Sequence, residues 1–412
     1  MRQEPNKYTA LVDLEAFPAS VEQSLNPGLR GRPVIVGGLP PARGIVICAS
    51  YEARARGVKF GMSLAEAFRV LPEAVFLKGD VKIYRDWWAQ VCDIFQMFTP
   101  EIEPVSMDEA YLGLHVILPD TAETISRSIR EAIERHLGIS CRVGVGRSKL
   151  FAKIACELAR DKRVRGEEPV VVIDAEEQED ILADLPVSRL PDLGFRTAVL
   201  MQELGVTTAA QLRKIPPPVL RAVFGKRGLE WHEYAGGKDR RRIRRRLLPG
   251  TISRETTFNA DSNDRGFLAG VSYYLLERVC LELRKRHLQA RRLGLKLRQV
   301  DFAAAETAVM MGQPTDSEAE MAPYLRRLFD NLYPGRRGIR HIGVVVSGLL
   351  PAVYQGDLFS YGKRARDLSR SLDCLRSRHG YHAVYYGRTM RLKGKFREVV
   401  DGYELRTPSL SL

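Results

Sequence analysis

The chain has 412 residues, 45% of them hydrophobic and 28% charged, a length and balance that favour several small domains over a single core. Lysine and arginine outnumber aspartate and glutamate by 64 to 50, and the formal net charge of +14 favours an anionic partner such as nucleic acid, although an anionic membrane surface would also fit. Six scattered cysteines without a Cys-x-x-Cys pair, no apolar leader and no membrane-length run predict a reduced, cytoplasmic protein and exclude a disulfide scaffold, a zinc finger and a membrane protein.

Two acidic segments stand beside apolar, strand-like runs. An expected strand beginning at Tyr8 ends in Asp13, and a helix is predicted over 19–25. Asp108 and Glu109 follow much later, between Val105 and a second apolar run. Neighbouring strand residues point to opposite faces, so this pair can serve one site only at a hairpin tip. An isolated pair is typical of a solvated turn. Carboxylates at two strand ends instead fit the two divalent cations with which phosphoryl-transfer enzymes clamp attacking and leaving oxygens.

The segments Asp13-Leu-Glu-Ala-Phe-Pro-Ala-Ser-Val-Glu22 and Ser106-Met-Asp-Glu-Ala-Tyr-Leu112 resemble the metal-binding motifs of Y-family translesion DNA polymerases, in particular the DNA polymerase IV branch. The resemblance runs from about Tyr8 to Phe359. It implies an α+β multidomain fold, a right-hand polymerase with a ferredoxin-like antiparallel palm. The implied ranges are palm 1–24 and 80–173, small fingers 25–79, helix-hairpin-helix thumb 174–237, basic linker 238–250, α+β little finger 251–350, and clamp-binding motif with C-terminal tail 351–412.

The resemblance also implies a catalytic set and its metal ions. Asp13, Asp108 and Glu109 would be catalytic, with two Mg²⁺ ions for which Mn²⁺ can substitute. Asp13 and Asp108 would bind both ions, and Glu109 the ion on the side of the nucleophile. The backbone carbonyl of Leu14 would complete the ion on the nucleotide side.

A short helix predicted from Ser50 to Val58, with Ser50 as N-cap, places Tyr51 and Arg54 on one face. Locally this pattern is typical of a solvated arginine. The resemblance instead implies that both bind the incoming triphosphate, beneath a roof over the base pair formed by Ile45 and Ile47. Arg160 takes the place of the family's triphosphate lysine, and Lys162 is the competing candidate.

Pro18 is the main departure from the family pattern. The family places Phe or Tyr there, packed under the deoxyribose to exclude a 2′-OH, whereas proline is smaller, fixes φ and lacks an N–H. Our hypothesis is that sugar discrimination is relaxed and that ribonucleotides are accepted beside dNTPs. The alternative is that Phe17 moves to serve as the gate.

Several expected DNA contacts follow along the chain. Lys149 lies in a segment similar to the family's glycine-containing palm motif, and residues 185–205 resemble a helix-hairpin-helix whose Gly194 would meet a phosphate. Asp192 replaces the first hairpin glycine there, and its charge would oppose that phosphate. The basic run 238–246 reads as a tether beside the duplex, with a solvated linker and a nuclear-localisation signal as the alternatives.

The C-terminal third reads strand, helix, strand, helix, strand over 251–258, 267–289, 291–301, 318–333 and 339–348, with Arg254 and Arg298 as template-phosphate candidates. Gln355, Leu358 and Phe359 resemble the bacterial sliding-clamp-binding motif. A basic amphipathic helix over 367–378 and then a poorly constrained tail are expected. Helices are also predicted over 80–98 and 121–137, the first with a core stripe of Ile83, Trp87, Val91, Ile94 and Phe95.

The resemblance implies a monomeric, low-fidelity, template-directed DNA polymerase that acts on primer–template DNA and dNTPs and is recruited by the sliding clamp. One rival is a catalytically silent relative that acts as a clamp-recruited DNA-binding scaffold, which Pro18 and the altered segment around Arg160 favour. The other is an unrelated palm enzyme such as a nucleotidyl cyclase, which would need neither a helix-hairpin-helix nor a clamp motif.

Overall fold

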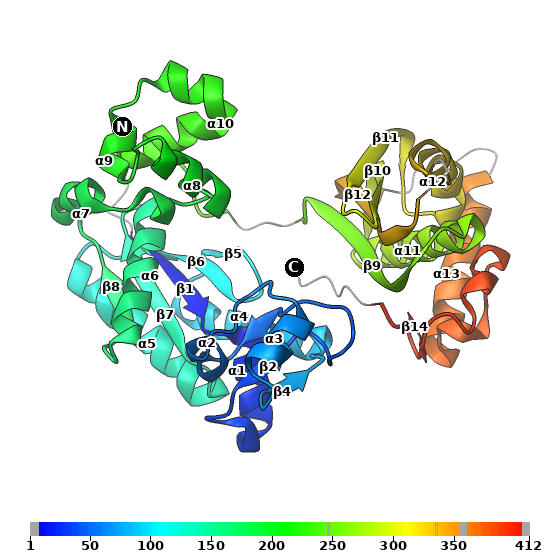
Figure 1. Cartoon of the computed structure of the whole chain (residues 1–412), viewed down its shortest axis with the longest axis horizontal. Helices are drawn as coiled ribbons and strands as arrows, with labels where there is room; N and C mark the ends of the chain where they lie inside the picture. Colours follow the sequence, from blue (N-terminus) through cyan, green and yellow to red (C-terminus); the bar gives the residue numbers. More distant parts are fainter. Residues whose placement is uncertain (1–7, 245–247, 334, 336, 354–360, 406–412) are drawn as a thin grey trace. The chain divides into compact units, whose positions relative to one another are not determined.

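The computed structural model describes residues 8–244, 248–333, 335, 337–353 and 361–405, without the side chains of 361–366. The chain divides into two compact units, Met1–Arg246 and Leu247–Leu410 (Figure 1). In this described part of the chain, no helix is both long and apolar enough to cross a membrane.

A five-stranded sheet forms the centre of the first unit, in the order β5-β6-β1-β7-β8. These strands are Ile102–Pro104 (β5), Glu109–Leu114 (β6), Tyr8–Leu14 (β1), Cys141–Gly146 (β7) and Val170–Val172 (β8). The first four pair antiparallel, but β8 is parallel to β7. The expectation of a fully antiparallel sheet is therefore wrong for β8, because the chain crosses over through helix α6 before it pairs again.

Four helices accompany this sheet: Phe17–Leu25 (α1), Val81–Phe98 (α4), Pro119–Leu137 (α5) and Lys149–Val164 (α6). For α1 and α4 the structure differs from the sequence interpretation in detail. α1 begins two residues earlier than predicted. In α4 the buried stripe includes Tyr84 and Trp88 rather than Ile83 and Trp87, with Val91, Ile94 and Phe95 as predicted. Both stripes have helical spacing, and packing selects the one that is rotated by a single residue.

A three-stranded sheet in the order β3-β2-β4 forms a smaller subdomain, from Cys48–Ala49 (β3), Val34–Val36 (β2) and Val75–Leu77 (β4). Helices Tyr51–Ala55 (α2) and Leu64–Val70 (α3) pack with it, after the short 3₁₀ turn Pro27–Leu29 (η1). Ser50 caps α2 as predicted, accepting a hydrogen bond from the Ala53 backbone N–H. Residues 44–47, just before β3, are irregular apart from one isolated bridge between Ile45 and Ser63.

Short helices complete the first unit: Ala175–Glu177 (η2), Gln178–Asp184 (α7), Val187–Arg189 (η3), Phe195–Glu203 (α8), Ala209–Arg213 (α9) and Pro217–Ala235 (α10). They share one apolar core that includes Val187, Leu190, Ala198 and Trp231. α10 is interrupted at Gly225, whose φ of 63° only glycine adopts readily.

The second unit is an antiparallel sheet in the order β11-β10-β12-β9, with two helices on one face (Figure 1). Its strands are Thr251–Ser262 (β9), Leu288–Gln299 (β10), Ala304–Thr315 (β11) and Ile339–Pro351 (β12), and its helices are Arg265–Lys285 (α11) and Glu318–Leu332 (α12). The sequence interpretation missed β11, an edge strand with Gly312 and Pro314 and few buried side chains, which gives little alternation to detect. It also extended α11 into residues that begin β10.

The C-terminal segment contains the helix predicted over 367–378, as part of α13, but the residues beyond it fold onto this unit instead of forming the expected unconstrained tail. It comprises Tyr361–His379 (α13), Tyr381–Ala383 (η4), Gly387–Leu392 (η5), Glu398–Val399 (β13) and Gly402–Tyr403 (β14). The prediction fails because Tyr381 and Tyr403 are buried aromatic anchors, with ring centroids 5.3 and 5.1 Å from that of Tyr274 in α11. The clamp-motif residues Gln355, Leu358 and Phe359 lie outside the described residues.

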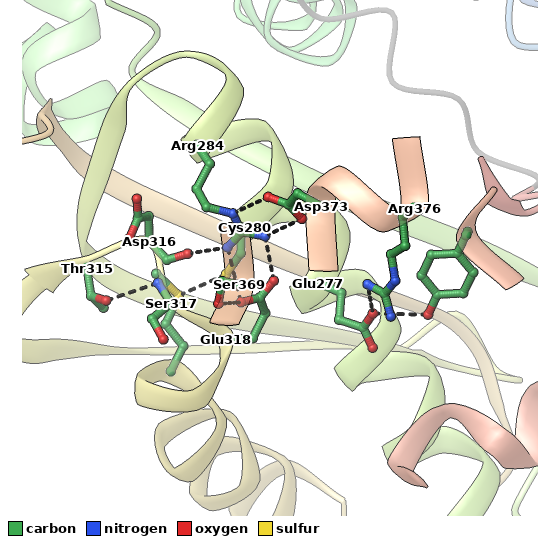
Figure 2. A network of polar contacts seen from close by, with 12 residues as sticks. Glu277, Cys280, Arg284, Thr315, Asp316, Ser317, Glu318, Ser369, Asp373 and Arg376 are labelled. Atoms are coloured by element: carbon green, nitrogen blue, oxygen red, sulfur yellow. Dashed lines mark hydrogen bonds and ion pairs between the residues drawn. The ribbon is translucent and has the colours of Figure 1, made fainter. Parts of the chain in front are cut away.

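A polar network joins α13 to the rest of the second unit (Figure 2). Arg284 of α11 donates to Glu318 at 2.7 Å and to Asp373 of α13 at 2.6 Å. Arg376 donates to the buried carboxylate of Glu277 at 2.9 Å. Burial raises the pKa of Glu277 to about 7. Because these charges are paired and largely buried, α13 is part of the fold rather than an appendage.

Candidate active site

The structure brings the predicted carboxylates together at a hairpin tip. Glu109 is the first residue of β6 and lies opposite Asp13 of β1, while Asp108 sits in the bend just before it. The Leu14 backbone N–H donates to the Asp108 carbonyl at 2.7 Å, and the Val105 N–H donates to the Glu109 carbonyl at 2.8 Å. These bonds fix the bend, so both adjacent acids stand beside the end of β1.

Basic side chains from β7 and α6 neutralise this cluster. Arg142 lies opposite Asp13 on β7 and pairs with its carboxylate. Lys153 of α6 places its Nζ 2.5 Å from Glu109 Oε1. Burial raises the pKa of Asp13 to about 6; Glu109 and Asp108 add to this rise, whereas Arg142 and Lys153 oppose it. The site therefore concentrates negative charge that the protein offsets with its own cations.

Gly144 explains how α6 comes so close to the sheet. A Cβ at Gly144 would lie 2.0 Å from the backbone nitrogen of Cys156 and 2.4 Å from the carbonyl oxygen of Ala152. Any other residue would push α6 away and withdraw Lys153 from Glu109. The glycines of this segment, a weak phosphate-binding signal in the sequence, thus serve helix–sheet packing.

The donor set suits a hard divalent cation. Asp13, Asp108, Glu109 and the Leu14 carbonyl supply only oxygen, the ligand type that Mg²⁺ prefers. Among the described residues, no three acidic, histidine or cysteine side chains already form a metal cluster. The carboxylates accept hydrogen bonds from protein donors instead. One of these is the Ser106 hydroxyl, which donates to Asp108 at 2.5 Å.

The predicted nucleotide-binding residues of α2 lie in a group of aromatic and charged side chains. The Arg54 guanidinium is 5.6 Å from the centre of the Tyr51 ring, and its Nε donates to the Ala49 carbonyl at 2.8 Å. Arg163 of α6 lies 6.0 Å from the same ring. Arg160, the predicted triphosphate arginine, instead pairs with Glu157 on its own helix.

The expected gate and roof positions differ in exposure. Phe17 is only 1% exposed and its ring centroid lies 6.5 Å from that of Trp88, so it is a core residue. Pro18, near the start of α1, is half-buried. Ile45 and Ile47 flank the buried Val46; Ile45 is exposed and Ile47 half-buried.

The two residues of the first unit that we predicted to contact DNA, Lys149 and Gly194, differ in their access to solvent. Lys149 is buried and its Nζ lies 2.5 Å from Glu103, so it does not reach the surface. Gly194 caps α8 and has open space around it. Asp192 occupies the left-handed region at φ 60°, and Arg227 and Arg241 lie within 3.6 and 3.5 Å of its carboxylate. The charge that would oppose a phosphate there is therefore balanced.

In the second unit the two predicted arginines lie on opposite faces of the sheet. Arg254 of β9 lies on the same face as the buried Ile252 and Phe258 and pairs with Glu282 of α11 at 3.2 Å, on the helix-covered face. Arg298 of β10 lies on the other face, where alternation also places Lys296 and Arg292. Of the two, Arg298 is the one on the open face.

The sequence interpretation missed three residues at the candidate site: Arg142, Lys153 and Arg163. Two signals could have found them. Strand alternation places Arg142 on the face of Gly144, and helical spacing places Lys153 and Arg163 on the same side of α6 as Cys156. Neither signal shows which carboxylate each cation meets.

Comparisons with known proteins identify the family. The impB/mucB/samB family model matches residues 12–157, and the model of its C-terminal domain matches residues 249–358. DNA polymerase IV of Dehalococcoides mccartyi (strain CBDB1) is 35% identical over 389 residues, 93% of this chain and 98% of the relative. DNA polymerase IV of Alkalilimnicola ehrlichii is 38% identical over 341 residues, 82% of this chain and 94% of the relative.

The chain belongs to the Y family of DNA polymerases, in its DNA polymerase IV branch. It is a DNA-directed DNA polymerase of the translesion type. A solved Y-family DNA polymerase chimera of Dbh and Dpo4 matches 83% of this chain and 99% of its own length, with a TM-score of 0.73 at 23% identity. DinB from Sulfolobus solfataricus matches 82% and 98%, with a TM-score of 0.59. These neighbours show the mixed α/β fold of a right-hand polymerase.

Arg142→Met should destabilise the metal-free polymerase in a pH-dependent way. Without the guanidinium the pKa of Asp13 rises above about 6, because the opposing charge is lost. At pH 8 we expect the free energy of unfolding to fall by about 3 kcal/mol, since an ionised, buried carboxylate loses its partner. The loss should shrink as the pH falls through 6, where protonated Asp13 needs no partner. Urea unfolding with EDTA at pH 5 and pH 8 measures this.

The matched control is Arg127→Met, which removes a surface arginine paired with Glu123 on α5 of the same unit. It should cost less than about 1 kcal/mol at both pH values. An equal cost of Arg142→Met at pH 5 and pH 8 would contradict the charge pairing at Asp13.

Proposed function

We propose that this polymerase adds nucleotides to a primer 3′-OH by a two-metal mechanism. Asp13, Asp108, Glu109 and the Leu14 carbonyl would hold two Mg²⁺ ions, for which Mn²⁺ can substitute. The observation that carries this proposal is the placement of two adjacent hairpin carboxylates opposite the acid that ends β1. When bound, such an ion pair supplies an activated 3′-oxygen and neutralises charge at the phosphate undergoing transfer.

The polymerase's own residues would bind and orient the reactants. Tyr51 and Arg54 would hold the triphosphate, and Ile45 and Ile47 would cover the nascent base pair. Arg142 and Lys153 offset part of the negative charge of the acidic cluster before the substrate arrives. The acids then require no large rearrangement of the backbone, because the bend at Asp108 is already fixed by hydrogen bonds.

The subdomain roles follow from the family and are part of the proposal. The five-stranded sheet would be the palm, the three-stranded subdomain the fingers, the short helices of 174–237 the thumb, and residues 251–350 the little finger. Gly194 at the start of α8 and Arg298 on the open sheet face would grip phosphates of the primer–template. Similar solved structures include an insertion ternary complex of Dbh DNA polymerase. Recruitment of a monomer by the sliding clamp, through Gln355, Leu358 and Phe359, completes the proposal.

Primer extension with a double variant tests the mechanism. Wild type should extend a primer with Mg²⁺ or Mn²⁺ and dNTPs, whereas Asp108→Ala/Glu109→Ala should lose at least about a thousandfold in rate, because two ligands are removed. Primer–template binding, measured by fluorescence anisotropy, should be retained in both. If wild type binds DNA but extends no primer under any condition, the chain is instead the clamp-recruited scaffold.

We also propose that Pro18 relaxes sugar discrimination. Its ring does not have the reach of the aromatic side chain that the family places there, and it offers no backbone N–H. The alternative gate, Phe17, is packed against Trp88 in the core, which argues against its movement toward the sugar. Ribonucleotides would therefore be used beside dNTPs.

Steady-state extension with dATP and ATP tests the role of Pro18. In wild type we expect kcat/KM for the two substrates to lie within about tenfold, since no ring contacts the 2′ position. Pro18→Phe should raise the preference for dATP by about a hundredfold, through a clash with the 2′-OH. Pro18→Ala, which adds no ring, should leave the ratio nearly unchanged. A strong dATP preference in wild type that Pro18→Phe barely alters would contradict this role.

A further inference from the structure

The last turn of α6 brings a cation to the nucleotide side of the site. The sequence interpretation had assigned no role to this residue. Arg163 lies in this turn, over the Tyr51 ring at 6.0 Å, and its Nε is 3.3 Å from Glu15 Oε2. Arg54 lies on the same ring at 5.6 Å. Two guanidinium groups from different elements thus converge on one tyrosine.

Arg160 is placed differently. Its guanidinium pairs with Glu157 on its own helix and its side chain is 50% exposed. The helix continues past it for another turn, to Val164. This added turn carries Arg163 to Tyr51, so the basic group that α6 presents to the triphosphate residues lies three positions beyond the one expected.

Glu15 explains how Arg163 is held. Its carboxylate is 1% exposed, directly after β1, and would repel a triphosphate if it stood alone. The pairing with Arg163 removes that repulsion. Nε is the Arg163 nitrogen nearest to Glu15, and this ion pair includes no hydrogen bond to either Glu15 oxygen. A guanidinium can bind a phosphate through two of its N–H donors.

We propose that Arg163 binds the β- and γ-phosphates of the incoming nucleotide and that Glu15 is the positioning residue that aims it. This inference rests on the proposed nucleotidyl transfer, whose site it completes. Tyr51 and Arg54 bind the triphosphate from the side of α2, and Arg163 binds it from the side of α6.

Equilibrium nucleotide binding tests this assignment without depending on catalysis. The probes are dATP and dAMP in Ca²⁺, titrated into the full chain bound to a dideoxy-terminated primer–template with 2-aminopurine beside the templating base. Arg163→Ala should raise the Kd for dATP about 10- to 100-fold, because charge-assisted hydrogen bonds to phosphate are lost. The Kd for dAMP should change by less than about threefold, since it lacks the two outer phosphates. Arg163→Lys should recover part of the loss.

Three further variants separate the explanations. Arg165→Ala removes an exposed arginine paired with Glu167 at the same helix end, and should leave the Kd for dATP unchanged. Glu15→Gln should weaken dATP binding as a single substitution. It should not weaken it further when combined with Arg163→Ala, because Glu15 acts through the arginine. If Arg160→Ala weakens dATP binding at least tenfold while Arg163→Ala has no effect, Arg160 is the triphosphate ligand and the inference is overturned. A loss of dAMP and dATP binding by equal factors in Arg163→Ala would also overturn it.

Failure of this inference differs from failure of the proposed function. If the wild-type protein extends primers and Arg163→Ala leaves the Kd for dATP unaltered, only the role of Arg163 is contradicted. If Arg163→Ala weakens dATP binding but the wild-type protein extends no primer, the proposed catalysis is contradicted and the assignment of Arg163 stands.

Discussion

The first unit depends on one electrostatic constraint: three carboxylates must stand together where β1 ends and β6 begins, without forcing these two strands apart. Burial raises the pKa of Asp13, and the like charges of Glu109 and Asp108 add to this rise. The fold meets this constraint with hydrogen bonds that fix the hairpin bend and with cations from the neighbouring strand and helix. Gly144 is needed for the same reason, because it lets α6 deliver Lys153 to the acids.

The same pairing principle extends toward the nucleotide side. Glu15 lies two residues beyond Asp13, and Arg163 lies ten residues beyond Lys153 on α6. Lys153 and Arg163 of α6 thus pair with acids of two neighbouring segments, Glu109 of β6 and Glu15 directly after β1. A substrate with several phosphates and bound divalent ions can exchange with these internal pairs, because it supplies both charges that the pairs would give up.

The sequence predicted the features that local pattern determines. The acid-bearing strand ends, the hairpin, the N-cap of α2 and the five helix or strand segments named in the second unit are all present. What it missed depends on contacts between distant segments. Arg142 and Arg163 reach the site only because β7 and α6 pack against β1 in the folded chain. Strand β11 has little hydrophobic alternation, and the C-terminal segment is ordered by Tyr381 and Tyr403, whose partner Tyr274 lies over a hundred residues away.

Direct counting of bound divalent ions tests the central claim most sharply. Electron paramagnetic resonance would measure free Mn²⁺ in titrations of the polymerase with a dideoxy-terminated primer–template and dATP. We predict two ions per complex in wild type and at least one fewer in Asp108→Ala, because Asp108 would be a ligand of both. Two ions bound with unchanged affinity in Asp108→Ala, or none in wild type, would contradict the account.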